Sequence, residues 1–379
     1  MKRRLCILGS TGTIGVNSLA LVDAHPNRFE VVSLTGGKNI ALLREQIRKF
    51  SPKRVAVLSD SDAKTLQSEF PDLKVDCGQS GIFQCIEESV DVVVNGIVGF
   101  AGLAPAIHAI RHKRLLGLAN KECLVAAGPL MRAEMEKSGA QVVPVDSEHN
   151  ALFQLLAGVK GEDVESLALT ASGGPFFRKP EIALETITPE QAIAHPNWKM
   201  GPKISVDSAT MMNKGLEIIE AHYLYGFSED KIEVWVHPQS IVHGAVRLKD
   251  GTLLAQLSVP DMKSAIGYSM TYPERLENSI RRMGFRDFAN LEFCEPDIRR
   301  FKCLELARNA LRLGPSHTLA LNAFNEVAVE AFLNKRIGFH QIPLVIEKGL
   351  EKFLGMPVDT LEAIYSCDEA ARAQIQTLL

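Results

Sequence analysis

The sequence predicts an α/β protein with a parallel-sheet domain, a smaller central α/β domain and a C-terminal helical bundle. Up to about residue 145, short β-branched runs alternate with amphipathic segments of helical length, which is typical of βαβ units. After Asp146 the pattern changes to strands mixed with helices and one hairpin. From residue 298 onwards, apolar residues recur at helical spacing, which favours a small bundle.

Seven apolar runs in the first part predict the strands of a parallel sheet. Glycine, asparagine or an acidic residue follows each run, as expected where a buried strand turns into a polar loop. The predicted strands cover residues 5–8, 31–34, 55–58, 73–75, 91–94, 115–118 and 141–145.

The central part predicts a second α/β unit that is smaller than the first. Its hairpin is indicated by two strand-like runs around the turn Asp250-Gly251. The predicted strands cover residues 165–170, 232–236, 241–248 and 253–258, and the predicted helices cover 188–196 and 208–225.

The C-terminal part predicts an extended linker followed by helices. Residues 272–297 carry prolines and arginines with little periodicity, whereas 320–333 and 342–353 show helical spacing. The expected domains are therefore 1–147, 148–271, the linker 272–297 and the helical domain 298–379.

Composition and charge exclude several classes of partner. The 379 residues include 42 basic and 45 acidic ones spread along the chain, so no polybasic arm is available for a nucleic acid or a membrane surface. No apolar run is long enough to span a bilayer. The seven cysteines are scattered and form no C-x-x-C pair, which indicates reduced thiols and a cytoplasmic location.

A glycine turn after the first strand indicates a nucleotide site. Gly9, Gly12 and Gly15 are spaced as GxxGxxG between a strand and a helix, where backbone amides can approach a pyrophosphate. The alternative is a tight strand-to-helix turn with no ligand. The position at the start of a βα repeat favours a Rossmann-like dinucleotide site.

The end of the second strand indicates which dinucleotide is bound. An NAD site usually has an acid there for the ribose 2′-hydroxyl, but this chain has Gly37, Lys38 and Asn39. A cation and backbone amides suit a 2′-phosphate, so NADP is favoured. The alternative is that Lys38 simply begins a solvated helix.

Acids near two later strand ends and on a helix indicate a metal and phosphate site. Ala119-Asn120-Lys121-Glu122 follows the strand predicted at 115–118, and Asp146 and Glu148 follow the last strand of the first part. Carboxylates are ligands that hard cations prefer. Asn213, Lys214 and Glu217 share one helical face, where an acid lies beside an amide and an ammonium. The alternatives are hydrated loop acids and a local ion pair on a solvated helix.

Two further segments have features of a substrate site. Ser172-Gly173-Gly174 at a strand end could donate hydrogen bonds to phosphate oxygens, or form a plain turn. The loop at residues 195–201 places Trp198 between proline and glycine, as in a lid, although a tryptophan folded onto its own domain is the alternative. His237 and His243 beside a strand could each be structural.

Together these segments resemble the 1-deoxy-D-xylulose 5-phosphate reductoisomerase family. The resemblance covers the first two domains in order and is weaker beyond Tyr272, where it rests on length and helical character. The matching segments are the turn from Gly9 to Gly15, Gly37-Lys38-Asn39, Ala119-Asn120-Lys121-Glu122, Val145-Asp146-Ser147-Glu148-His149-Asn150, Ser172-Gly173-Gly174-Pro175-Phe176, residues 195–201, residues 205–217 and His237-Pro238-Gln239-Ser240.

The resemblance implies an NADPH-dependent and metal-dependent enzyme of the non-mevalonate isoprenoid route. Such an enzyme isomerises and reduces 1-deoxy-D-xylulose 5-phosphate to 2-C-methyl-D-erythritol 4-phosphate, usually as a homodimer. The metal ligands implied are Asp146, Glu148 and Glu217, with the choice among Mg²⁺, Mn²⁺ and Co²⁺ open. Two other readings stay open from the residues alone: an NADP-dependent dehydrogenase of another phosphorylated metabolite, and a non-catalytic NADP-sensing protein.

The resemblance also assigns individual residues. Catalytic roles fall on Lys121, Asp146, Glu148, Glu217 and His195. Substrate contacts fall on Lys121, Ser147, Glu148, Ser172, His195, Trp198, Ser208, Asn213, Lys214 and Glu217, with the phosphate held by Ser172, Ser208, Asn213 and Lys214. Cofactor contacts fall on Gly9, Thr11, Gly12, Thr13, Ile14, Gly37, Lys38, Asn39, Asn120, Glu122 and Gly201.

Overall fold

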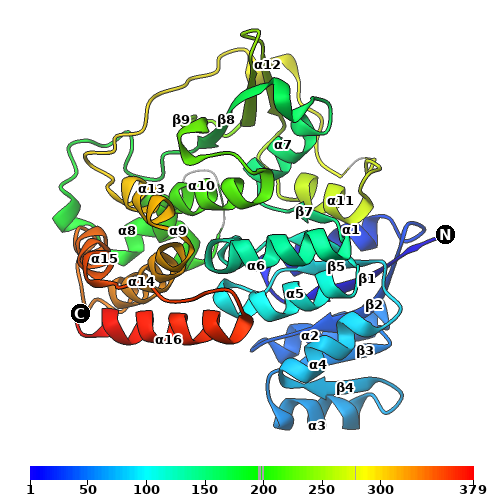
Figure 1. The fold of residues 1–379 in the computed structure, drawn as a ribbon. Coiled ribbons are helices and arrows are strands. Elements are labelled where there is room, and N and C mark those ends of the chain that lie inside the picture. Colours follow the sequence, from blue (N-terminus) through cyan, green and yellow to red (C-terminus); the bar gives the residue numbers. More distant parts are fainter. Residues whose placement is uncertain (195–197, 199, 278) are drawn as a thin grey trace. The chain divides into compact units, whose positions relative to one another are not determined.

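The structure is a computed structural model that describes residues 1–194, 198, 200–277 and 279–379 (Figure 1). The chain divides into two compact units, each made of more than one segment. Unit 1 comprises Met1–Cys123, Ala133–Asn150 and Asp261–Arg281, and unit 2 comprises Leu124–Arg132, Ala151–Pro260 and Arg282–Leu379.

Unit 1 is built on a parallel sheet, which confirms the fold class predicted for the first part. Within the described residues, this sheet has seven strands in the order β4-β3-β2-β1-β5-β6-β7. The chain moves outward from β1 in one direction through β4 and then in the other through β7, so the strand order reverses between β1 and β5. The strands are β1 (Arg3–Leu8), β2 (Phe29–Thr35), β3 (Arg54–Val57), β4 (Lys74–Cys77), β5 (Val92–Asn95), β6 (Leu115–Leu118) and β7 (Val142–Pro144).

Helices follow most of these strands, as βαβ connections require. Helices α6 and α7 each pass from unit 1 into unit 2 or back. The helices with residues in unit 1 are α1 (Thr13–Ala24), α2 (Ile40–Phe50), α3 (Asp60–Glu69), α4 (Gly78–Glu87), η1 (Gly99–Gly102), α5 (Leu103–Arg111), α6 (Glu122–Ser138), α7 (Ser147–Leu156) and α11 (Lys263–Thr271).

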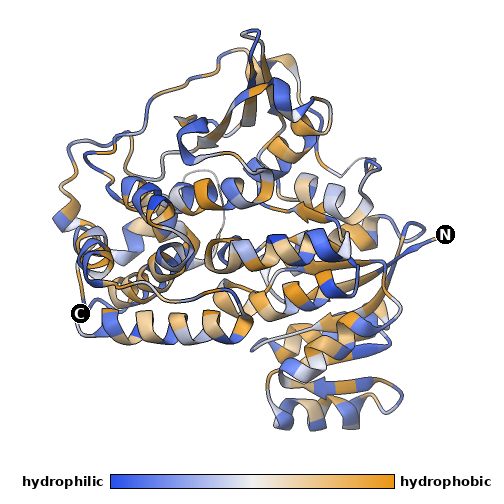
Figure 2. Ribbon diagram, viewed as in Figure 1, coloured by the Kyte–Doolittle hydropathy of each residue, from blue (hydrophilic) through white to orange (hydrophobic). Residues whose placement is uncertain are grey.

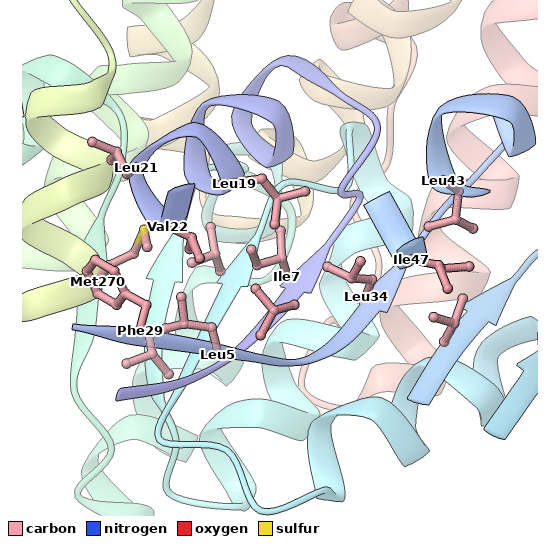
Figure 3. Close-up of a cluster of buried hydrophobic side chains, with 14 of the residues drawn as sticks. Leu5, Ile7, Leu19, Leu21, Val22, Phe29, Leu34, Leu43, Ile47 and Met270 are labelled. Atoms are coloured by element: carbon pink, nitrogen blue, oxygen red, sulfur yellow. The ribbon is translucent and has the colours of Figure 1, made fainter. Parts of the chain in front are cut away.

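The core of unit 1 lies between the sheet and its helices (Figure 3). Leu19 and Val22 of α1 point toward Ile7 of β1, and Met270 of α11 lies in the same cluster. Burying an aliphatic side chain of this size stabilises a fold by about 1.5–3 kcal/mol. The cluster therefore fixes β1 and α1, the two elements that flank the glycine turn.

Helix α11 belongs to unit 1 although it is distant in sequence. It packs against α1 and against β5, β6 and β7, and Figure 1 shows the yellow-green α11 beside the blue α1. The boundary expected at residue 271 groups this helix with the central domain. The structure groups it with unit 1 because Ile266 and Met270 complete that core.

Unit 2 contains a mixed sheet, and its antiparallel pair confirms the predicted hairpin. Strands β10 and β11 are antiparallel, and their connecting turn contains Gly251 with φ +87°. The described part of this sheet has the order β11-β10-β8-β9. Its strands are β8 (Val164–Ala171), β9 (Ile232–Val236), β10 (Val242–Leu248) and β11 (Leu253–Leu257).

The long helix expected at residues 208–225 is in fact two helices. Helix α9 (Pro202–Ala209) ends before α10 (Met212–Tyr225), and Met211 between them has a left-handed φ of +63°. That expectation was therefore wrong at its start, because the chain reverses its backbone conformation at Met211. The break separates Ser208 from Asn213 and gives each its own helix.

The remaining helices of unit 2 include the predicted C-terminal helices. Helix α14 packs against α13, α15 and α16, which form the bundle. These helices are η2 (Gly161–Asp163), η3 (Leu184–Thr186), α8 (Pro189–Ala192), η4 (Glu229–Lys231), α12 (Phe285–Phe288), α13 (Cys303–Leu313), α14 (Pro315–Leu333), α15 (Gln341–Lys352) and α16 (Leu361–Gln376).

The segment at residues 272–297, expected as a linker, runs from unit 1 into unit 2. It contains the short helix α12 and a bridge between Val236 and Cys294. This segment therefore adds one antiparallel contact to the end of β9.

Helix α16 shows how the bundle helices face both the core and the solvent. Its buried residues include Ile364, Cys367, Ala371 and Ile375, which lie three or four residues apart. Hydrophobic and hydrophilic residues accordingly alternate along this helix (Figure 2). Among the residues the structure describes, no helix meets the length and hydropathy needed to cross a membrane.

Candidate active site

The glycine turn links β1 to α1 at the point where the strand order reverses. Gly9 has φ +73°, and a Cβ atom there would lie 2.9 Å from the Gly96 carbonyl oxygen beyond β5. A Cβ atom on Gly15 would lie only 2.3 Å from Ser10 Cα. The turn therefore requires glycine at both positions for backbone packing. Ligands of open α/β sheets bind at such a reversal.

Polar contacts hold this turn in place. The Gly9 amide donates to Thr35 Oγ1 at 2.9 Å, and Ser10 Oγ donates to Gln46 Oε1 at 2.7 Å. Gln46 Nε2 in turn donates to the Ser10 carbonyl at 2.9 Å. Gly12 is the N-cap of α1 and is exposed, as is Thr13. The first amides of a helix have no intrahelical acceptor, so this end can bind an anion.

The loop after β2 brings the predicted cofactor residues to the same edge of the sheet. Asn39 Oδ1 accepts from the Leu42 amide at 3.1 Å and so caps α2. Lys38 directly before this cap is exposed. Asn39 therefore has a structural role of its own, whereas Lys38 extends into solvent beside Gly37.

Asn120 is buried and links the segments that follow two strands. Its side chain is 3% exposed, and its Nδ2 donates at 2.5 Å to the carbonyls of Ile97 and Gly99. These residues follow β5, while Asn120 follows β6. These two hydrogen bonds fix the backbone on which Lys121 and Glu122 lie.

An ion pair joins the ends of β6 and β7. Lys121 Nζ lies 2.6 Å from Asp146 Oδ2, and their side chains are 6% and 12% exposed. Asp146 Oδ1 also accepts from the Glu148 amide at 3.2 Å, which orients the start of α7. Ser147 Oγ hydrogen-bonds to Glu148 Oε2. Four of the predicted site residues thus lie after two neighbouring strands and are joined by these contacts.

Helix α10 holds a second group of predicted residues in unit 2. Asn213 Nδ2 donates to Glu217 Oε1 at 2.6 Å, and the Lys214 ammonium pairs with Glu217 Oε2. The side chains of Lys214 and Glu217 are 3% and 1% exposed. The helical spacing predicted this shared face. The structure adds that the pair is buried, which excludes the solvated helical face.

The turn after β8 approaches the end of α9 closely. Gly173 and Gly174 have φ of +82° and +71°, and a Cβ atom on Gly174 would lie 2.7 Å from the Ser208 carbonyl oxygen. The Gly174 amide donates to Ser172 Oγ at 3.2 Å. The structure therefore brings the Ser172 turn next to Ser208, although 36 positions separate them in the sequence.

The predicted lid is described only in part. His195 lies outside the described residues, so its predicted role has no structural counterpart here. Trp198 is half-buried, and Gly201 is the exposed N-cap of α9. The segment thus leads directly into the helix that carries Ser208.

The two histidines near β10 have structural roles. His237 Nδ1 donates to the Glu292 carbonyl at 2.7 Å, and its ring stacks on Phe293 with centroids 4.6 Å apart. Burial lowers the pKa of His237, which keeps the ring neutral at pH 7. His243 Nε2 lies 3.3 Å from the Ser258 carbonyl, so both histidines hold neighbouring segments together.

Sequence reasoning missed the contacts of Asp207. This carboxylate is buried, lies 3.0 Å from Lys203 Nζ and accepts from Asn325 Nδ2 at 2.8 Å. Asn325 lies on α14, 118 positions away, and no local pattern could have signalled the contact. The pair links the helical bundle to α9, which carries Ser208.

Comparison with known proteins assigns most of the chain to one family. Residues 5–128 match the family model for 1-deoxy-D-xylulose 5-phosphate reductoisomerase. Residues 142–225 and 257–374 match two models for C-terminal domains of the same family. The match at 257–374 includes the C-terminal helices, where the sequence itself offered only length and helical character.

Named relatives and solved structures agree with these matches. The 1-deoxy-D-xylulose 5-phosphate reductoisomerase of Prosthecochloris aestuarii is 45% identical over 375 residues, with 98% of each chain covered. That of Chlorobaculum tepidum is 44% identical, with 100% of each chain covered. The Zymomonas mobilis enzyme in complex with NADPH is 37% identical, with a TM-score of 0.93 over 100% of this chain and 99% of that one.

A second solved structure bears on the ligands of the family. It is a DOX-P reductoisomerase in complex with NADPH, fosmidomycin and magnesium, 38% identical, with a TM-score of 0.92 and 99% of each chain covered. These similarities extend over both compact units and the whole length of the sequence. The chain therefore belongs to the 1-deoxy-D-xylulose 5-phosphate reductoisomerase family.

Proposed function

We propose that this chain isomerises 1-deoxy-D-xylulose 5-phosphate and reduces the product to 2-C-methyl-D-erythritol 4-phosphate, using NADPH and a divalent metal ion. The observation that carries this proposal is the Lys121–Asp146–Glu148 group at the carboxyl edge of a dinucleotide-binding sheet. An ammonium and two carboxylates at that edge suit a metal-dependent reaction of an oxygen-rich substrate.

The glycine turn supports the NADPH part of the proposal. The exposed N-terminus of α1 suits the pyrophosphate, and the acid that usually holds an NAD ribose is replaced by Lys38. The two solved structures compared above are complexes with NADPH, which supports the same cofactor here. Cofactor contacts are proposed for Gly9, Thr11, Gly12, Thr13, Ile14, Gly37, Lys38, Asn39, Asn120, Glu122 and Gly201.

The metal part of the proposal rests on the types of side chain available. Asp146, Glu148 and Glu217 offer only carboxylate oxygens, which fits Mg²⁺ or Mn²⁺. Lys121 and Lys214 each hold one of these carboxylates in a fixed orientation within its own unit. When bound, the metal polarises the carbonyl and hydroxyl oxygens of the substrate, and NADPH supplies the hydride.

The phosphate part of the proposal rests on unit 2. Ser172 lies on the turn whose Gly174 approaches Ser208 at the end of α9. Asn213 and Lys214 lie at the start of α10, which packs against α9. Hydroxyl, amide and ammonium donors of this kind bind a phosphate monoester. His195 and Trp198 are proposed to close over the phosphate and exclude water, with Lys121 and Ser147 contacting the substrate's other oxygens.

We also propose a homodimer in the cytoplasm, with a cofactor-binding domain, a catalytic domain and a C-terminal helical domain in the order expected from the sequence. All seven cysteines lie in the described part of the chain and are free thiols, which supports a reducing compartment. Burial raises the pKa of Cys6 and of Cys303 to about 12, so these two thiols are inert and serve packing.

A chelation assay tests the proposed reaction class. The oxidation of NADPH in the presence of 1-deoxy-D-xylulose 5-phosphate is measured by the decrease in NADPH absorbance. The rate is compared before and after addition of EDTA, and again after addition of excess Mg²⁺. We expect turnover that EDTA abolishes and Mg²⁺ restores. Turnover that resists EDTA would favour the simple dehydrogenase, and cofactor binding without turnover would favour the sensing protein.

Replacing Lys38 tests the choice of cofactor. For Lys38→Ala we expect the KM for NADPH to rise by about tenfold, because a cation beside the 2′-phosphate contributes on the order of 1.4 kcal/mol. The KM for NADH should not change. Lys64→Ala, at another exposed lysine of unit 1, is the matched control and should leave both values unchanged. An unaltered KM for NADPH in Lys38→Ala would discard the assigned role.

A further inference from the structure

A second group of potential metal ligands lies outside the proposed active site. Glu87, His108 and His112 each offer one ligand atom, and these atoms lie within 4.8 Å of one another. Glu87 ends α4, and the histidines lie at the C-terminal end of α5. All three belong to unit 1, and none of them is needed for the reaction proposed above.

The spacing of the histidines places both rings on one side of the helix. Residues four apart lie one above the other on a helical surface, and this pair continues from α5 into its C-cap. The ring centroids of His108 and His112 are 4.2 Å apart. Two imidazoles in this arrangement can bind one transition-metal ion together.

Neighbouring groups fix the orientation of each ligand. His112 Nδ1 donates to the His108 carbonyl at 2.9 Å, which leaves the Nε2 lone pair of His112 available. The His108 ring stacks on Phe83 with centroids 4.1 Å apart and an interplanar angle of 5°. Glu87 Oε2 accepts from Gln84 Nε2 at 3.1 Å, which directs Oε1 toward His108.

The distance between Glu87 Oε1 and His108 Nε2 is close to the distance between two ligands of one metal ion. His108 Nε2 lies 2.9 Å from Glu87 Oε1, within hydrogen-bond distance. Metal–ligand distances of about 2.1 Å would place two ligands of a tetrahedral ion about 3.4 Å apart. Opening the pair by about half an ångström requires only a rotation of Glu87, whose side chain is 37% exposed.

The charges around the group permit a cation. The nearby Arg111 guanidinium is paired with Glu134 at 2.6 Å, so its repulsion of a bound cation is partly offset. Glu87 and His112 are exposed, which leaves room for water in the fourth position. Imidazole nitrogen ligands favour Zn²⁺ over Mg²⁺, in contrast to the all-oxygen set of the active site.

We propose that Glu87, His108 and His112 form a surface binding site for Zn²⁺ with three protein ligands. This site is separate from the proposed Mg²⁺ site in both position and ligand chemistry. Zn²⁺ would bind there without displacing Mg²⁺.

Zn²⁺ binding by the full chain in saturating Mg²⁺ tests the proposal. Affinity is measured by competition with a chromophoric chelator for the unchanged chain, His108→Gln, His112→Gln and the control His25→Gln. His25 is a matched control because it is the C-cap of α1, as His112 is of α5. We expect the affinity to fall about tenfold or more in the two cluster variants and to be unchanged in the control.

A second readout separates this site from the active site. Co²⁺ in a site with nitrogen ligands and low coordination number gives visible absorption, which should be lost in His112→Gln and kept in Glu217→Gln. Folding of each variant is checked by its Tm. The proposal is overturned if the unchanged chain binds no Zn²⁺ under saturating Mg²⁺, or if all variants bind it equally.

Discussion

Glu217→Gln is expected to lower kcat for NADPH oxidation by about 10³-fold or more while leaving the Kd for NADPH unchanged. The substitution keeps the size of the side chain but removes the negative charge proposed to bind the metal. NADPH binding should persist because Glu217 is not among the residues proposed to contact the cofactor. Steady-state kinetics and a fluorescence titration with NADPH measure the two effects.

Controls separate this chemical effect from a loss of stability. Glu217 is a counter-ion of the buried Lys214, so neutralising it destabilises the fold by on the order of 3 kcal/mol. Activity is therefore measured well below the Tm of the variant. Glu330→Gln, at an exposed glutamate of α14, should retain full activity. Wild-type turnover by a folded Glu217→Gln enzyme would remove Glu217 from the metal site.

Gly15→Ala is expected to lower the Tm by about 5–10 °C and to weaken NADPH binding. An added Cβ atom would lie 2.3 Å from Ser10 Cα and 2.5 Å from the Gly9 carbonyl oxygen, and these backbone atoms cannot move aside cheaply. Overpacking of this kind costs about 1–3 kcal/mol, and each kcal/mol lowers the Tm of a unit of this size by about 2–4 °C.

Gly12→Ala in the same turn is the matched comparison. Gly12 has φ −83°, which any residue adopts, and an added Cβ atom would lie 3.4 Å from the Gly9 carbonyl oxygen. The Tm should therefore fall much less than in Gly15→Ala, by no more than the small cost of alanine at an N-cap, whereas NADPH binding should weaken if Gly12 faces the pyrophosphate. Equal loss of stability in Gly12→Ala and Gly15→Ala would show that close packing at Gly15 is not the cause.

The parallel sheet could be predicted from sequence because most of its strands are largely buried and read as apolar runs. The hairpin at Asp250-Gly251 was equally legible, since the turn chemistry is local. The break between α9 and α10 could not be predicted from the sequence. It depends on a left-handed Met211, and neither glycine nor proline marks the position.

Local patterns also predicted part of the candidate site. The spacing of Asn213, Lys214 and Glu217 predicted that they share one helical face, but it did not predict that Lys214 and Glu217 are buried. The approach of Gly174 to Ser208 and the hydrogen bond from Asn325 to Asp207 join distant segments. Such contacts depend on tertiary packing, so a single sequence carries no signal for them.

The Lys121–Asp146 pair could be predicted in part. Both residues follow predicted strands, but nothing in the sequence shows that these strands are neighbours. The sheet order places β6 beside β7, and this adjacency creates the 2.6 Å contact. Knowledge of the strand order is thus what turns two separate assignments into one group.

Analysis of the product tests the proposed reaction most directly. The chain is incubated with 1-deoxy-D-xylulose 5-phosphate, NADPH and Mg²⁺, and the product is identified by ¹³C NMR. We expect a branched skeleton in which the methyl group is attached to a quaternary carbon, as in 2-C-methyl-D-erythritol 4-phosphate. An unbranched reduced sugar phosphate would contradict the proposed rearrangement and would identify a simple dehydrogenase instead.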